Sequence, residues 1–250
     1  MRSRFKQLAP DLVEVPAGTV LVGSTEEQIA AAARAFGVAP EALLNEAPQH
    51  RVELPAFAIG RGPVSCNEYL AFLTATDHPA PQGWLDGEPP HGKQDHPVVG
   101  VGFNDARAYC RWLSTATGRV FRLPTEQEWE RAARGDDGRQ FPWGEEWRPD
   151  WCNTAAAGLA DTAPIGSFAQ DVSPFGCVDM GGNVAEWTGV RFRPYPGSTL
   201  AAPTQTVVAL RGGSWRSGPD QARCTRRILP VNALGDPAVG FRVLATGEEF

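Results

Sequence analysis

Residues 175–187, which read FGCVDMGGNVAEW, are the most informative stretch of this chain. They place two carboxylates, Asp179 and Glu186, on either side of a glycine-containing turn and end at a tryptophan. The stretch lies within residues 141–207, where almost no periodic pattern of apolar residues appears. Such a long aperiodic segment is uncommon inside a compact domain, so we expect something other than regular structure to hold it together.

Several segments before this stretch carry helix-start signals. The three candidate capping boxes, each a Ser or Thr followed three residues later by Glu, are Ser24–Glu27, Ser65–Glu68 and Thr125–Glu128. A further helix is expected to be capped by Asn104 or Asp105 and to end at Gly118. The residues on its expected buried face are Ala106, Tyr109, Cys110 and Leu113.

Strand patterns are short and few. Residues 13–24 predict two strands around a Pro-Ala-Gly turn, and 207–212 and 240–244 predict closing strands. Residues 77–97 are rich in Pro, Gly, His and Asp and predict a long surface loop. Short helices, few strands and long loops indicate a loop-rich α+β domain and not a series of βαβ units.

The composition indicates one globular domain. Hydrophobic residues make up 42% of the 250 residues, and no linker composition interrupts the chain. We therefore expect an N-terminal extension at residues 1–12 and a single domain at residues 13–250.

Charge and hydropathy exclude several partners and compartments. The formal net charge is −6 and no long Lys/Arg run appears, so we expect no nucleic-acid partner. No window approaches 18 uninterrupted apolar residues and the first residues lack an apolar core, so neither a membrane span nor a signal peptide is expected. Cytoplasm is the expected compartment. The 5 cysteines form no CxxC pair and are expected to be reduced, with one disulfide or one reactive thiol as the alternatives.

Nine stretches occur together in a fixed order. They are VPAGTVLVGS, NEAPQHRVEL, HPVVGVGFNDARAYCRWLS, RLPTEQEWERAARG, FPWGEEW, TAPIGSF, FGCVDMGGNVAEW, RGGSW and GFRV. In this order they resemble the formylglycine-generating enzyme, or sulfatase-modifying factor, family over about residues 13–243. The resemblance implies a loop-rich C-type-lectin-like fold. The family includes copper oxidases, iron-dependent sulfoxide synthases, enzymes of siderophore maturation and ligand-binding relatives without known catalysis.

The resemblance also implies structural calcium. Matched to one family calcium loop, Asp179 and Glu186 would supply side-chain oxygens, and Gly182 and Val184 would supply carbonyl oxygens. Alternatively, the two carboxylates only cap and hydrogen-bond their loop. Asn153 and Thr154 match a second family calcium site. The acidic ligand of that site falls near Ala157, whose methyl side chain cannot bind a metal.

The copper-binding positions of the family carry no cysteines in this chain. Counted from Gly212-Gly213-Ser214-Trp215, the two thiolate positions are Ser217 and Ala222. A hydroxyl and a methyl group are poor ligands for the soft Cu(I) ion. Cys224 lies two residues beyond and is expected to be a small buried residue. The identity of any redox metal therefore stays open, and we assign no catalytic residue.

The segment after the RGGSW motif corresponds to the pocket of the family. The expected pocket-lining residues are Ser214, Trp215, Ser217, Arg223, Cys224 and Arg226. The arginines are expected either to pair with carboxylates or to bind an anionic or peptide ligand. The tryptophans expected to be structural, each with its indole N–H on a backbone carbonyl, are Trp129, Trp143, Trp187 and Trp215, with ligand stacking as the alternative role.

Three functions remain open on the sequence. The first is a divergent oxygen-dependent oxidoreductase with altered or no metal chemistry. The second is a binding module for a small molecule or peptide on the same lectin-like scaffold. The third is a true formylglycine-generating oxidase with displaced ligands. Whether the chain is an enzyme is therefore undecided, and the substrate or ligand is not identified.

Overall fold

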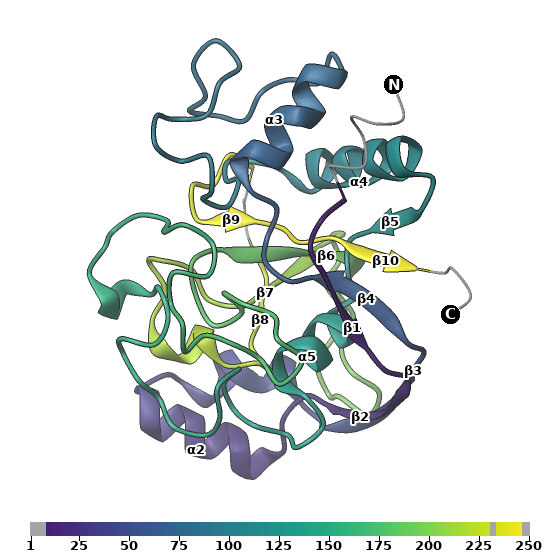
Figure 1. The fold of residues 1–250 in the computed structure, drawn as a ribbon. Coiled ribbons are helices and arrows are strands. Elements are labelled where there is room, and N and C mark those ends of the chain that lie inside the picture. The colour runs from purple at the N-terminus through teal and green to yellow at the C-terminus, as the bar shows by residue number, and fades with distance from the viewer. Residues whose placement is uncertain (1–8, 231–233, 247–250) are drawn as a thin grey trace.

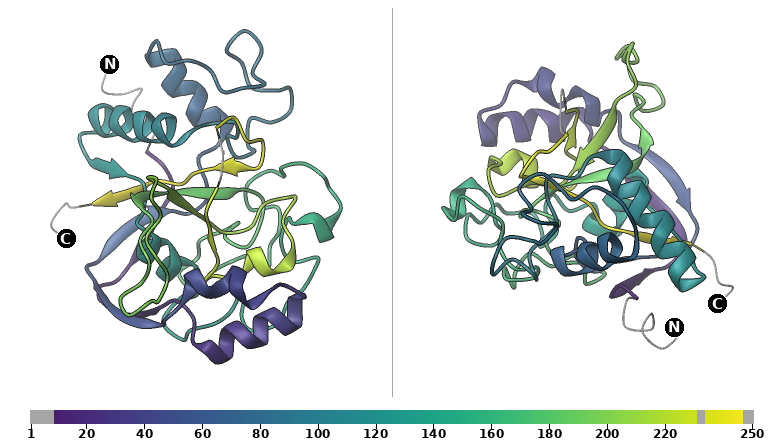
Figure 2. Two further views of the ribbon diagram at one scale, coloured as in Figure 1. Left: turned by 180° about the vertical axis from the view of Figure 1, so that it is seen from behind. Right: turned by 90° about the horizontal axis from the view of Figure 1, so that it is seen from above.

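The structure, a computed structural model, describes residues 9–230 and 234–246. Most of the expected N-terminal extension, residues 1–12, lies outside them. Helices α3 and α4 pack at one end of the molecule, α2 lies at the opposite end, and the sheets run between them (Figure 1). The view from behind shows the same arrangement (Figure 2).

The strands form three small sheets. The first has the order β1-β4-β10-β5, with all pairs antiparallel. Its strands are Leu12–Val15, Phe57–Gly60, Leu244–Thr246 and Val120–Arg122. The second pairs β2, Gly18–Val22, with β3, His50–Leu54. The two strands predicted within residues 13–24 are therefore present, but they belong to different sheets.

The third sheet has the order β8-β7-β6-β9. Its strands are Arg227–Ile228, Val208–Arg211, Ala185–Arg191 and Val239–Gly240. Strand β9 pairs with β6 in parallel, while the other pairs are antiparallel. The predicted closing strand at residues 240–244 is in fact two strands, β9 and β10, which complete two different sheets.

The helices are short. The α-helices are α2 at Glu26–Phe36, α3 at Cys66–Ala75, α4 at Phe103–Thr117 and α5 at Glu126–Arg134. The 3-10 helices are η1 at Pro40–Glu46, η2 at Ala155–Ala157 and η3 at Pro219–Ala222. No helix in the described part of the chain combines the length and apolarity needed to cross a bilayer.

Two of the predicted capping boxes are confirmed and two helix starts are corrected. Ser65 with Glu68 and Thr125 with Glu128 cap α3 and α5 as predicted. The expected Ser24–Glu27 box is wrong.

The capping box of α2 begins one residue later. Thr25 and Gln28 form it, while the Ser24 hydroxyl donates 3.2 Å to a Glu46 oxygen. Because Ser24 has this buried partner, it is not available to the helix.

Helix α4 is capped by Gly102 and not by Asn104 or Asp105. The Asp105 carboxylate instead accepts the Gly102 N–H at 2.8 Å from inside the first turn. The four residues predicted on the buried face of α4 are all buried, and Gly118 ends the helix in the left-handed conformation. The spacing of apolar residues predicts this face correctly because the face packs into the main apolar cluster.

Ion pairs are buried throughout the interior. The Arg242 guanidinium makes two 2.7 Å hydrogen bonds to Glu186 and also donates to the Gly60, Arg61 and Val178 carbonyls. The equivalent pairs are Arg227–Glu126, Arg211–Glu130 and Arg223–Glu46. All these arginines are at most 2% exposed. Arg242 contributes to holding the aperiodic segment, because its partners Glu186 and Val178 lie within residues 141–207.

Candidate functional site

Ser217 and Ala222, the two positions matched to the copper ligands of the family, are buried away from solvent. Ser217 is 5% exposed, and its hydroxyl accepts the Ser214 N–H at 2.9 Å and lies 2.9 Å from the Ser214 hydroxyl. Ala222 is fully buried against Phe141 and Cys152. The indole N–H of Trp215 donates to the Pro237 carbonyl at 3.1 Å, as expected for a structural tryptophan.

The thiol of Cys224 is also inaccessible. Cys224 is 1% exposed, and burial raises the pKa of its thiol above the usual range. Each of the 5 cysteines is free and buried, which matches the expectation of reduced thiols. A protonated, buried thiol is a poor nucleophile and a poor metal ligand.

The expected pocket arginines pair with carboxylates. Arg223 makes hydrogen bonds of 2.7 and 2.8 Å to the two oxygens of Glu46. Burial alone would raise the pKa of Glu46, but the Arg223 guanidinium and the Thr225 hydroxyl hold it below its usual value. Arg226 lies 3.2 Å from Asp220. The six residues expected to line a pocket do not line either of the two hollows described below.

The two carboxylates of the expected calcium loop have other partners. Both oxygens of Glu186 accept from Arg242, and one also accepts the Trp129 indole N–H at 2.8 Å. Asp179 accepts from the Gly166 N–H and the Asn183 amide, each at 3.0 Å. Glu186 would have to exchange Arg242 for the ion, so this donor set does not fit calcium as it stands.

The second expected calcium loop has free oxygen atoms. The Asn153 side-chain oxygen and the Thr154 hydroxyl are buried and have no hydrogen-bond partner among the described residues. An unpaired buried oxygen costs about 1–3 kcal/mol, which favours a bound ion or water nearby. These atoms fit a hard cation better than Glu186 does, although Ala157 supplies no carboxylate. The calcium sites stay predictions.

An imidazole or mixed metal cluster is not found in the described residues, where no three His, Cys, Asp or Glu side chains converge. His78 lies 3.0 Å from Asp105, and His96 lies 2.9 Å from the Thr162 hydroxyl. His50 packs on the Tyr195 ring. These contacts give the three histidines roles in holding loops.

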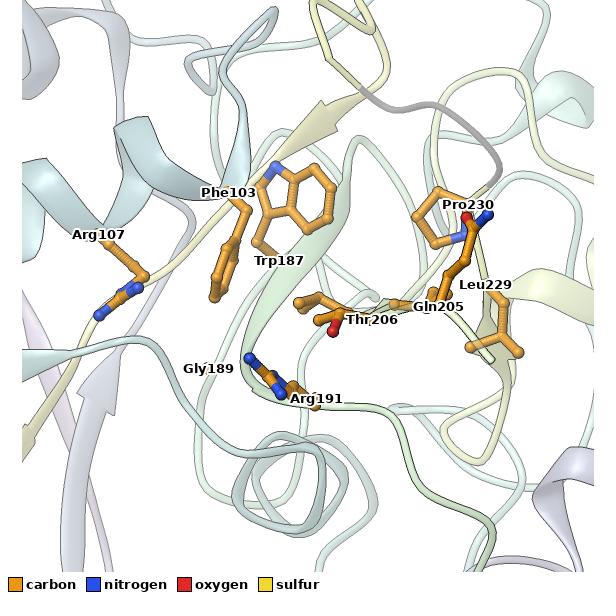
Figure 3. A pocket seen from close by; sticks show the side chains of 11 residues that line it. Phe103, Arg107, Trp187, Gly189, Arg191, Gln205, Thr206, Leu229 and Pro230 are labelled. Carbon is orange, nitrogen blue, oxygen red and sulfur yellow. The ribbon is translucent and has the colours of Figure 1, made fainter. Parts of the chain in front are cut away.

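A large hollow lies elsewhere, between α4, β6 and the start of β7. It has a volume of about 860 Å³. Phe103 and Trp187 form one wall, with ring centroids 6.0 Å apart, and Leu229 and Pro230 lie on the opposite side (Figure 3). The Trp187 indole N–H donates to the Val101 carbonyl, so that ring is held in place.

Two arginines lie at this hollow. The guanidinium carbon of Arg107 lies 5.6 Å from the Phe103 ring centroid, and Arg191 is the last residue of β6. Both are exposed, and neither has a hydrogen bond or ion pair with another described residue. No carboxylate is among the described residues that line the hollow. The arrangement can stack a flat group and attract an anion.

Sequence reasoning missed these residues because they come from separate elements. One usable signal was Arg107 with Arg111, which are four residues apart on the predicted helix and have no acidic residue at helical spacing. Nothing in the sequence connects them to Arg191, which reaches the hollow only through the path of β6.

Comparison with known proteins agrees with the motif order. A profile of the sulfatase-modifying factor enzyme 1-like domain matches residues 1–246. The formylglycine-generating enzyme of Mycobacterium tuberculosis is 30% identical over 94% of this chain and 97% of its own length. The hercynine oxygenase of Mycolicibacterium smegmatis is 31% identical over 83% of this chain, and the match spans 58% of that enzyme.

A solved structure is similar over nearly the whole chain. PvdO from Pseudomonas aeruginosa is 30% identical, with a TM-score of 0.76, over 96% of this chain and 95% of its own. The similarity includes the loop-rich α+β arrangement described above, so the predicted fold class is confirmed.

Proposed function

This chain belongs to the family of sulfatase-modifying factor enzyme 1-like domains, and we propose that it is a ligand-binding member of that family. The family includes formylglycine-generating oxidases, hercynine oxygenases and non-catalytic members. The proposed ligand is a small molecule or peptide that combines a flat ring with a negative charge.

The observation that carries this proposal is the hollow between α4 and β6. It joins the fixed rings of Phe103 and Trp187 to two exposed arginines that have no described partner. Aromatic stacking contributes about 0.5–1.5 kcal/mol beyond area burial. A hydrogen bond to a charged group contributes about 1.5–3 kcal/mol. A ring with a carboxylate or phosphate would use both contributions.

We further propose that the chain does not oxidise cysteine with Cu(I). Ser217 and Ala222 stand where the related oxidases have thiolates, and Cys224 is buried. Anaerobic Cu(I) titration against a chelator should show no tight one-to-one binding. Tight binding lost in Cys224→Ser, with oxidation of a cysteine peptide, would revive the third function.

An oxygen-dependent oxidoreductase is the second candidate. The relatives favour it, because one is named a formylglycine-generating enzyme and another a hercynine oxygenase. Oxygen uptake with a bound ligand, together with a redox metal found by mass spectrometry of the purified protein, would support it over simple binding.

Structural calcium at Asn153 and Thr154 and a cytoplasmic location belong to the same proposal. The two unpartnered buried oxygens support the ion, and five free thiols fit a reducing compartment. With a net charge of −6, nucleic acid is not proposed as a partner.

Calorimetric titration tests the ligand proposal. The probes are 2-naphthoate, indole-3-acetate and anthranilate, with 2-naphthamide as the uncharged comparison. At least one anion should bind, the amide should bind more weakly, and Arg191→Gln should weaken the anion about tenfold, or about 1.4 kcal/mol. Arg51→Gln is the matched control, because Arg51 is exposed on β3, in a different sheet from β6, and does not line the hollow. Equal binding of acid and amide would reject the proposal.

A further inference from the structure

A second hollow continues the first. It has a volume of about 560 Å³ and lies between α4, β5 and β6. Arg107 and Gly189 line both hollows. Together they form one trough that runs along α4, and we call it the α4 trough.

The second hollow is also positive. Arg111 lies four residues after Arg107 on α4, so their side chains leave the same helix face about 5–6 Å apart. Arg111 is exposed and has no hydrogen bond or ion pair within the described part of the chain. No carboxylate is among the residues that line this hollow. Arg122 also lies there, but it is bound by Glu128 at 2.6 and 2.7 Å.

The thiol of Cys110, at the base of the second hollow, responds to these guanidinium groups. Burial raises the pKa of Cys110 to about 12, and the charges of Arg111, Arg107 and Arg122 oppose that rise. These three arginines lie near Cys110, and Arg122 among them is paired with Glu128. The trough thus holds Arg107, Arg111 and Arg191 without a described partner, and its described lining contains no acidic residue. In a chain of net charge −6, such a surface is complementary to an anionic ligand.

The shape of the trough fits an extended chain. The second half of β6 passes between the hollows: Trp187 and Arg191 line the larger one and Val190 lines the smaller. Strand β9 pairs with β6 at Ala185 and Glu186, and further along the same edge the Gly189 N–H donates to the Pro124 carbonyl at 2.7 Å. This edge of β6 is therefore already bonded between the two hollows. An extended peptide would lie across the trough and place its side chains in the two hollows, as peptides do in the side-chain pockets beside a strand.

We propose that the α4 trough binds an extended acidic peptide, with a flat side chain against Phe103 and Trp187 and a carboxylate between Arg107 and Arg111. This inference rests on the proposed ligand-binding function and names its ligand class. A peptide is favoured over a nucleic acid because three free arginines are few for a phosphate backbone and the rest of the chain is acidic.

The test uses the whole chain and a set of synthetic peptides. Each acetylated peptide contains one tryptophan beside one glutamate, and a second glutamate follows two, three, four or five residues later. The comparison peptides replace the second glutamate with glutamine. At about 3.3 Å per residue, this series places the two carboxylates roughly 7–17 Å apart along an extended chain.

The second glutamate should strengthen binding at least fivefold at one spacing in the wild type. That gain should disappear in Arg111→Gln, whose affinity for 2-naphthoate should stay unchanged, and it should persist in the control Arg34→Gln. Arg34 is exposed near the end of α2, at the opposite end of the molecule (Figure 1).

Two results would overturn the inference. Equal affinity for the one- and two-glutamate peptides at every spacing would reject the second hollow as a carboxylate site. Competition by an oligothymidylate as strong as that of the best peptide would reject the peptide assignment. In either case, naphthoate binding that depends on Arg191 would leave the proposed function standing, whereas its loss would reject both.

Discussion

The arginines of the interior and those of the α4 trough have the same side chain and opposite surroundings. Arg242, fully buried, makes two hydrogen bonds to Glu186 and three to backbone carbonyls. Arg107, Arg111 and Arg191 are exposed and have no such partner among the described residues. The first kind holds irregular loops together, since a guanidinium can satisfy several carbonyls at once. The second kind is available to bind an anionic ligand.

Removing an interior arginine should have the largest effect. Arg242→Met is expected to cost about 3–5 kcal/mol of stability, because Glu186 is left as a buried charge without its cation. Urea unfolding followed by tryptophan fluorescence measures it. The double variant Arg242→Met with Glu186→Leu should recover part of the loss. A cost below about 1 kcal/mol for the single variant would remove the distinction between the two groups of arginines.

An interior carboxylate without an arginine partner should show the opposite pH dependence to a paired one. Burial, and then the charge of Asp179, raises the pKa of Asp171 well above its usual value. Folding therefore takes up a proton, and stability falls as pH rises from about 3.9, the unfolded pKa, toward the folded pKa. The fall is up to about 1.4 kcal/mol per pH unit.

Asp171→Asn should remove this dependence. Its stability relative to the wild type should rise between pH 5 and pH 8, as measured by urea unfolding at each pH. Glu46 acts in the other direction, since its lowered pKa stabilises the fold above the unfolded value and that contribution is lost as pH falls. Parallel pH curves for wild type and variant would contradict the assignment to Asp171.

The buried oxygens of Asn153 and Thr154 also lack partners within the described part of the chain, and a ligand at them is expected to have a smaller effect on stability than the loss of Arg242. Calcium bound there should raise the free energy of unfolding by about 2.7 kcal/mol at a hundredfold excess over Kd. Thermal melting with calcium, magnesium or EDTA measures the response. Asn153→Ala should lose it and Asp179→Asn should keep it. A wild-type melting temperature that changes with neither calcium nor EDTA would contradict the calcium site and indicate that water binds these oxygens.

The smallest effect is expected in the trough. Replacing Arg107, Arg111 and Arg191 with glutamine should change the free energy of unfolding by no more than about 0.5 kcal/mol, because exposed unpaired side chains contribute little. Urea unfolding of this triple variant checks it. A loss above about 1.5 kcal/mol would show that these arginines support the fold and would weaken the case for a ligand.

Sequence patterns predicted what is local in this molecule. The boxes at Ser65–Glu68 and Thr125–Glu128 are decided within four residues, and so they were right. The Ser24–Glu27 box failed because Thr25 and Gln28 fit the same pattern and Ser24 has a distant partner, Glu46. Three of the four expected tryptophans donate to a backbone carbonyl, while Trp129 donates to Glu186.

The candidate site could not be predicted in this way. The family positions after RGGSW led to Arg223 and Arg226, which the structure pairs with Glu46 and Asp220. The partner of Arg223 is 177 positions away in the chain, which no local pattern reveals. The α4 trough likewise needs the path of β6 beside α4, which no local pattern contains.

The placement of β9 and β10 has a consequence for synthesis of the protein. Strand β10, Leu244–Thr246, lies between β4 and β5, and β9, Val239–Gly240, forms the edge of the third sheet. Two sheets therefore stay incomplete until the ribosome has made residues 239–246, after every other strand. Until then the nascent domain has exposed strand edges. We therefore expect the domain to fold after translation of these residues and not during it. Chaperones that cover exposed strand edges would have their largest effect in that interval.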